Sequence, residues 1–106
     1  MDEKIRPTDL ARRKEQITII DIRKEPDDRQ IPGSLRYDGI ELVEAETLPF
    51  TDNDEVVLYC GSGNSCSRVA ATLRERGYNT IALDGGYRAW KESGFDTEPI
   101  GEKREI

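Results

Sequence analysis

The chain has 106 residues, of which 36% are charged and 35% hydrophobic, and its formal net charge is −6. This length predicts one domain with a core of its own, and the acidic balance argues against a basic nucleic-acid-binding surface. With no histidine in the chain, Cys–His pairs, Ser–His–Asp triads and most zinc sites are excluded. We expect a cytoplasmic protein, because no apolar run suits a signal peptide or a membrane span.

The first half of the chain predicts one buried strand and two short helices. Residues 17–22 are nearly all apolar, which predicts a strand buried on both faces of a parallel sheet. Residues 7–15 predict a helix with Thr8 as its N-cap. The other predictions are at most one helical turn over 24–30, a turn into an extended segment over 31–36, a short helix over 38–45 and a loop over 48–54.

The second half predicts strands and helices in alternation. Strands are predicted over 55–59 and 79–83, and helices over 66–76 and 87–92, the first ended by Gly77 and the second by Gly94. Short βαβ connections predict an α/β fold, a mostly parallel twisted sheet with helices on both faces. We therefore expect a single domain over 1–106, with its core at about 8–94 and a loose charged tail over 95–106.

Cys60 is the main candidate for chemistry. It follows the predicted strand 55–59 directly, and the carboxyl ends of strands are where open α/β sheets bind ligands. The loop after it leads into the start of a helix, and backbone N–H groups at such a place favour thiolate over thiol. The alternative is an inert, buried core cysteine.

The loop after Cys60 has a composition suited to surrounding one atom with amides. Gly61 and Gly63 tolerate unusual backbone angles, and Asn64 tolerates the left-handed region. Ser62 and Ser65 add hydroxyl donors for an anionic sulfur or sulfonate.

Several segments, in this order and spacing, resemble the rhodanese-like family of single-domain sulfurtransferases. The resemblance covers about residues 8–94 and rests on Ile20-Asp21-Ile22-Arg23, Ile31-Pro32-Gly33-Ser34, Val57-Leu58-Tyr59-Cys60-Gly61-Ser62-Gly63-Asn64-Ser65, Ala70-Ala71-Thr72-Leu73, Gly77-Tyr78 and Leu83-Asp84-Gly85-Gly86-Tyr87-Arg88-Ala89-Trp90.

The resemblance implies an enzyme that moves sulfane sulfur from a donor, such as thiosulfate or a persulfide, to a thiol acceptor. Cys60 would be the nucleophile that carries the sulfur as a persulfide, without a metal or an organic cofactor. The expected partners are a small-molecule sulfur donor and a thiol acceptor, small or protein, and neither nucleic acid nor membrane. The substrate-binding residues would be Gly61, Ser62, Gly63, Asn64, Ser65 and Cys66.

Two departures from related patterns bear on substrate choice. Family members often carry Arg or Lys in the loop, where this chain has Gly61 and Ser65. Recognition of doubly charged thiosulfate is therefore in question, and Arg68 is a partial substitute. The phosphatase and arsenate-reductase relatives need Cys-x5-Arg, whose Arg position holds Cys66 here, which argues against oxyanion transfer.

Two alternatives stay open from the residues alone. Cys66 is either a packing residue or a resolving thiol, whose pKa the same helix start would also lower. The domain is either an enzyme, a non-enzymatic persulfide carrier or a Cys60/Cys66 redox module. Asp21 and Arg23 are expected to form a structural ion pair, and Trp90 to pack in the core.

Overall fold

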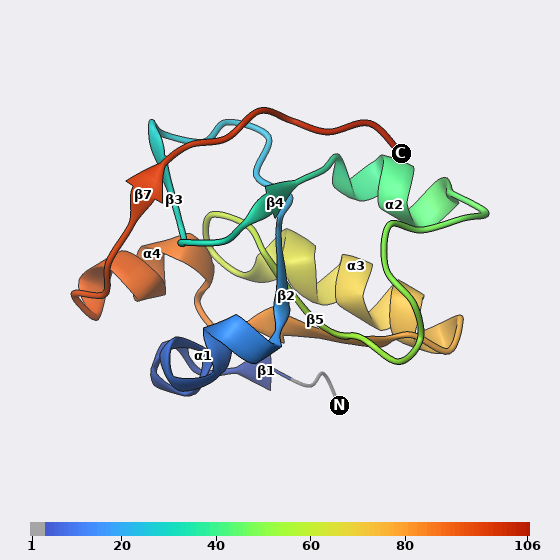
Figure 1. Ribbon diagram of the computed structural model, residues 1–106, viewed down its shortest axis with the longest axis horizontal. Helices are drawn as coiled ribbons and strands as arrows, with labels where there is room; N and C mark the ends of the chain where they lie inside the picture. Colours follow the sequence, from blue (N-terminus) through green and yellow to red (C-terminus); the bar gives the residue numbers. More distant parts are fainter. Residues whose placement is uncertain (1–3) are drawn as a thin grey trace.

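The computed structural model describes residues 4–106, and its centre is a five-stranded parallel sheet (Figure 1). All four pairings between neighbouring strands are parallel. In spatial order the strands are β1 (Lys4–Ile5), β6 (Asn79–Leu83), β5 (Glu55–Tyr59), β2 (Thr18–Asp21) and β4 (Leu35–Arg36). The predicted mostly parallel sheet is confirmed.

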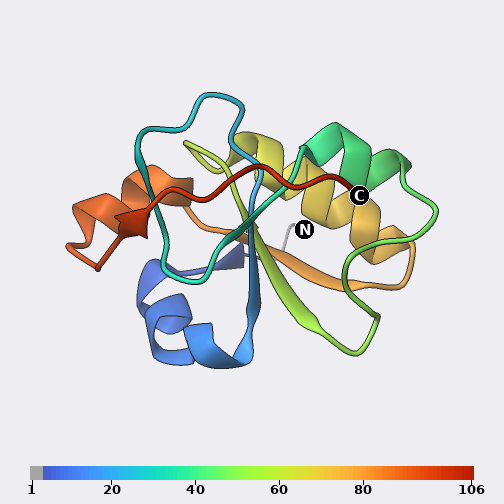
Figure 2. The ribbon, with the colours of Figure 1, turned by 45° about the horizontal axis from the view of Figure 1, so that its top comes forward.

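Helices cover both faces of the sheet, as predicted. Helices α2 (Gly39–Glu44) and α3 (Asn64–Glu75) lie together on one side in Figure 2, and α1 (Pro7–Arg13) and α4 (Gly86–Glu92) on the other. Each pair of helices buries its apolar side chains in a core of its own. One core includes Leu42 and Leu73, and the other Leu10 and Trp90, which is 1% exposed and so confirms the expected packing role.

Strands β2 and β5 carry consecutive apolar residues because each of their faces meets a core. Successive side chains of a strand point to opposite faces. Ile20 and Leu58 therefore enter the core under α2 and α3, whereas Ile19 and Val57 enter the core under α1 and α4. The register sets Ile20 beside Leu58 on the neighbouring strand.

The N-terminal region departs from prediction in two respects. Thr8 is not the N-cap of α1; Arg6 takes that place and Pro7 is the first helical residue. The fixed φ of proline and its missing N–H suit the first helical position, so the helix begins before Thr8. Strand β1 was not predicted, because two residues carry no periodic pattern, and a 3-10 turn at Lys14–Gln16 follows α1.

The predicted loose tail is also wrong, because the C-terminal segment lies along the sheet. Strand β7 (Glu98–Pro99) pairs antiparallel with β3 (Arg29–Gln30). Farther on, Arg104 N–H donates to the Arg36 carbonyl at 2.8 Å. Figure 1 shows the segment passing β3 and β4 and ending near α2. Its polar residues find partners about 68 positions away in the chain, which no local pattern reveals.

The starts of α2 and α3 are held in different ways. Asp38 caps α2, and its Oδ1 accepts from the N–H groups of Ile40 and Glu41. Helix α3 begins at Asn64, two residues earlier than predicted, after Gly63 at φ 98°.

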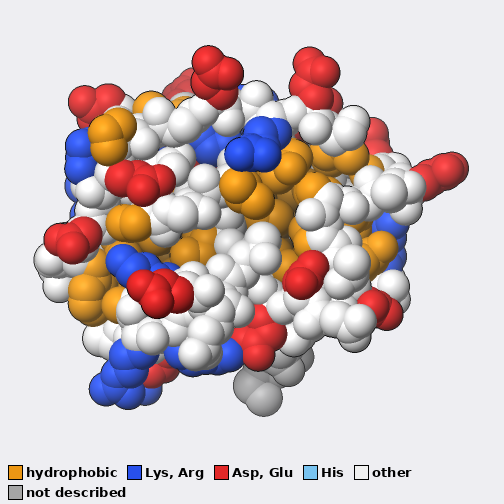
Figure 3. Space-filling view, viewed as in Figure 1, with side chains coloured by type: hydrophobic (Ala, Val, Ile, Leu, Met, Phe, Trp, Pro, Cys, Tyr) orange, Lys and Arg blue, Asp and Glu red, His pale blue; other side chains and the backbone are white. Residues whose placement is uncertain are grey.

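Acidic and basic side chains are interspersed over the face of the molecule that Figure 3 shows.

No helix in the described residues is both long and apolar enough to cross a membrane.

Candidate active site

Cys60 lies directly after the last residue of β5, on the inner side of the turn into α3. Its side chain is nearly buried, at 6% exposed. Two backbone N–H groups donate to its Sγ, that of Gly63 at 3.1 Å and that of Cys66 at 3.4 Å. The two predicted features, a strand-end cysteine and amides directed at its sulfur, are therefore both present in the structure.

The opposite side of the loop Cys60–Ser65, here called the cysteine loop, is held by α4. The Cys60 carbonyl accepts from Tyr87 N–H at 2.8 Å, and the Gly61 carbonyl from Arg88 N–H at 3.1 Å. Gly86 makes this approach possible: its φ is 62°, and a Cβ there would lie 2.5 Å from the Cys60 carbonyl oxygen. No local sequence pattern predicts this role of Gly86.

The electrostatics of the loop favour the Cys60 thiolate. The Cys66 thiol first, and then the backbone N–H groups of Cys66, Gly63 and Ser65, lower the pKa of Cys60 to about 5, whereas burial opposes this shift. Amide dipoles and a donor thiol stabilise the anion more than they stabilise the neutral form. The loop therefore favours the thiolate form of Cys60 over the thiol.

Cys66 behaves as a packing residue. Its side chain is 0% exposed and belongs to the apolar core that includes Ala70 and Leu73. Its one S–H has two acceptors within reach, the Cys60 sulfur and the Gly63 carbonyl oxygen, which lies 3.3 Å from the Cys66 Sγ. The neighbouring Cys60 sulfur and then burial raise its pKa, which contradicts the expectation, tied to a resolving thiol, that the helix start lowers it.

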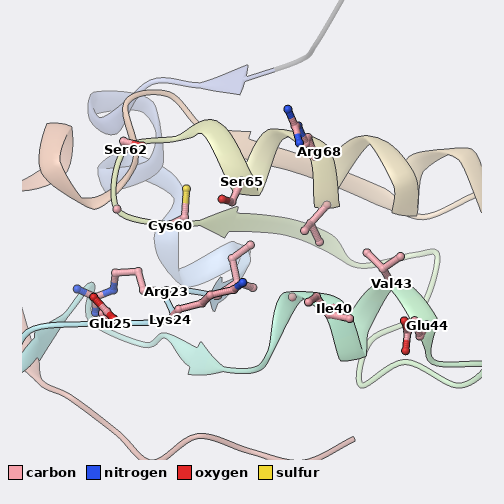
Figure 4. A pocket seen from close by; sticks show the side chains of 14 residues that line it. Arg23, Lys24, Glu25, Ile40, Val43, Glu44, Cys60, Ser62, Ser65 and Arg68 are labelled. Atoms are coloured by element: carbon pink, nitrogen blue, oxygen red, sulfur yellow. The ribbon is translucent and has the colours of Figure 1, made fainter.

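The sulfur of Cys60 borders a cavity of about 550 Å³ between the cysteine loop and α2 (Figure 4). Of the predicted substrate-binding residues, Gly61, Ser62 and Ser65 line the cavity. The others, Gly63, Asn64 and Cys66, belong to the loop and the first turn of α3 but do not line it. The structure therefore divides the predicted set into residues that face the cavity and residues that shape the loop.

The far side of the cavity comes from segments that sequence reasoning missed. Its apolar residues are Ile22, Ile40 and Val43, and Val69 of α3 adds to the apolar lining from the near side. Figure 4 shows Ile40, Val43 and Glu44 of α2 across from Ser65 and Arg68 of α3. The only local signal was the position of residues 22–25 after a strand end, because α2 is 16 or more residues before Cys60.

Arg23 and Asp21 form a buried ion pair at the end of β2, as expected. Arg23 Nη2 lies 2.7 Å from Asp21 Oδ2 and also donates to the Arg29 carbonyl at 2.7 Å. The guanidinium stacks over Tyr87, 4.0 Å from the ring centroid. Arg23 thus ties together β2, β3 and α4.

The other charged groups of the cavity wall are of both signs. Lys24 and Arg68 are exposed cations, and neither has an ion pair within residues 4–106. Glu25 and Glu44 line the same cavity. The cysteine loop itself carries no charged side chain besides the thiolate, so cations surround the sulfur only at a distance.

These features define a class of α/β domain in which a loop of backbone amides surrounds a cysteine sulfur at a strand end. The family model for the rhodanese-like domain matches residues 6–93. The chain therefore belongs to the rhodanese-like domain family. A search of curated proteins finds no match to it.

Solved structures of rhodanese-related proteins share the fold. A rhodanese-related protein from Thermoplasma volcanium is 23% identical, with a TM-score of 0.80 over 91% of this chain and 97% of that one. The rhodanese-like domain of an Anabaena protein is 26% identical, with a TM-score of 0.79 over 94% and 81%. A thiosulfate sulfurtransferase from Pseudomonas aeruginosa is 28% identical, with a TM-score of 0.77 over 93% of this chain but only 20% of that one.

Proposed function

We propose that the protein is a sulfurtransferase that carries sulfane sulfur as a persulfide on Cys60. The observation that carries this proposal is the Cys60 Sγ, which accepts two backbone N–H groups and borders an open cavity. A thiolate kept ready at neutral pH is the nucleophile that sulfur displacement needs. The thiosulfate sulfurtransferase among the structural neighbours supports the same chemistry.

The reaction divides into two displacements at sulfur. The Cys60 thiolate attacks the sulfane sulfur of the donor; the new S–S bond forms as the old one breaks, and the leaving group departs with the electron pair. An acceptor thiolate then attacks the outer sulfur of the Cys60 persulfide and takes it, which releases Cys60 as thiolate. The amides of Gly63 and Cys66 stabilise the Cys60 thiolate before the first displacement and again when the second displacement releases it.

A second candidate is a non-enzymatic carrier that receives its sulfur from a partner's persulfide. The uncharged Gly61 and Ser65 favour it, because a persulfide that is handed over needs no pocket for a sulfonate group. A redox module of Cys60 and Cys66 has less support, because Cys66 is fully buried and its pKa is raised.

The proposal is tested by intact mass after incubation with thiosulfate and, separately, with a low-molecular-weight persulfide. We expect a gain of one sulfur atom in the wild type and in Cys66→Ala, and none in Cys60→Ala. An adduct with the persulfide alone indicates the carrier. No adduct with either donor, or an adduct that survives Cys60→Ala, contradicts both. Loss of two hydrogens that depends on Cys66 indicates the redox module.

A further inference from the structure

We propose that the cavity beside Cys60 selects a singly charged organic sulfane donor with an apolar body over inorganic thiosulfate, and that Ile40 determines this preference. This inference rests on the proposed function and specifies its substrate class. It follows from three properties of the cavity, namely its apolar wall, its charge balance and its size.

An apolar wall lines the same cavity as Cys60. Among residues 4–106, only two large hydrophobic residues are exposed, Ile40 at 57% and Ile106 at 48%. Ile40 lines the cavity together with Val43, Ile22 and Val69. An apolar group placed there covers surface that water otherwise contacts, which is favourable for binding. Thiosulfate has no such group to offer.

The charges around the cavity do not suit a dianion. Arg23 is neutralised by Asp21 at 2.7 Å. The remaining cations, Lys24 and Arg68, share the wall with Glu25 and Glu44, and the thiolate adds a further negative charge. A donor with two negative charges therefore meets more repulsion than a donor with one.

The size of the cavity also exceeds what thiosulfate fills. At about 550 Å³ it lies within the range of roughly 300–1,000 Å³ that is typical of sites for organic ligands. An organic thiosulfonate combines a sulfane sulfur, a single charge and an apolar body. Attack by the Cys60 thiolate on its terminal sulfur forms the persulfide and releases the organic sulfinate with the electron pair of the broken S–S bond.

The test compares benzenethiosulfonate with thiosulfate, two donors that share the reacting S–S bond but differ in their body and charge. The rate constant for persulfide formation is measured by intact mass in single turnovers for the wild type, Ile40→Ser and the matched control Ile106→Ser. We expect Ile40→Ser to slow the reaction of benzenethiosulfonate about fivefold and that of thiosulfate less than about twofold. Ile106→Ser should change neither rate.

Each other result overturns the inference. A loss shared equally by both donors, no loss with either, or an equal loss in Ile106→Ser shows that Ile40 does not recognise the organic body. In those cases a Cys60 adduct still leaves the proposed function standing, whereas the absence of an adduct with both donors contradicts the function itself. Circular dichroism of the two variants must match the wild type, which we expect because both side chains are exposed.

Discussion

The two sides of the cavity differ in what builds them. The cysteine loop is built by backbone: amides of Gly63 and Cys66 contact the sulfur, and α4 holds the outward carbonyls. The opposing wall, residues 22–25 and α2, is built by side chains, of which Ile40 and Lys24 are exposed.

The difference separates reactivity from selectivity. Backbone dipoles are fixed by the fold, so the anionic sulfur is stabilised whatever the donor is. Lys24, Glu25 and Ile40 on the opposing wall are exposed and can change with little cost in stability. Changes in the loop should therefore affect folding and nucleophilicity, and changes in the wall should affect the choice of substrate.

The largest expected effect comes from filling the contact between α4 and the cysteine loop. Gly86→Ala places a Cβ 2.5 Å from the Cys60 carbonyl oxygen and 2.7 Å from Gly63 N, at a positive φ. We expect a loss of about 4 kcal/mol in the free energy of unfolding, measured in urea. Gly77→Ala is the control, because its φ is also positive but its Cβ meets nothing within 4 Å. Equal losses would show that no close contact exists.

The next effect concerns the support of the opposing wall. Asp21→Asn leaves the Arg23 guanidinium buried without its carboxylate, and we expect a loss of about 3 kcal/mol in unfolding free energy. The exposed pair of Arg13 and Glu55 serves as a control, and Glu55→Gln should cost less than about 1 kcal/mol. Thermal or urea denaturation of both variants measures the difference. A small loss in Asp21→Asn would mean that the buried pair adds little to stability.

The cysteine loop also predicts a pH dependence. Because the pKa of Cys60 falls from 9.0 to about 5 on folding, the folded protein binds fewer protons between these values and stability rises with pH. This contribution is present above about pH 9 and is lost as the pH falls to about 5. Cys60→Ser should remove it, so the difference in unfolding free energy between wild type and variant should grow over this range.

Alkylation kinetics measure the same pKa directly. The rate of iodoacetamide modification at Cys60 should reach half its maximum near pH 5. Cys66→Ala should shift this midpoint upward, because the Cys66 thiol is the largest cause of the lowered pKa. A wild-type midpoint near pH 9 would show that the loop does not activate the cysteine.

The smallest expected effect comes from adding a positive charge to the cysteine loop. A Cβ at Gly61 meets nothing within 4 Å, so Gly61→Arg is sterically tolerated. The added guanidinium should increase kcat/KM for thiosulfate about fivefold, while the value for a singly charged donor changes little. Gly61→Ala is the control for the loss of glycine. An equal gain with both donors would show that the loop charge does not discriminate between them.

The sequence predicted much of the fold because its signals are local. The apolar runs 17–22 and 55–59 specify strands buried on both faces, and Gly77 ends α3 at a positive φ of 96°. Prediction from the sequence was wrong at Thr8, because the proline before it starts the helix. It was also wrong for the C-terminal segment, which was predicted to be a loose tail. There the pairing of β7 with β3 depends on residues far apart in the chain.

For the site, the residues alone identified Cys60 as the candidate nucleophile, together with its amide-rich loop. A cysteine between a strand end and a helix start is surrounded by backbone N–H groups. Only the tertiary structure decided that Gly86 lets α4 hold this loop, that Cys66 is buried in the core, and that Ile40 lines the same cavity as Cys60. These contacts join segments that lie 6 to 26 positions apart, and packing between helices and sheet, which no local pattern encodes, brings them together.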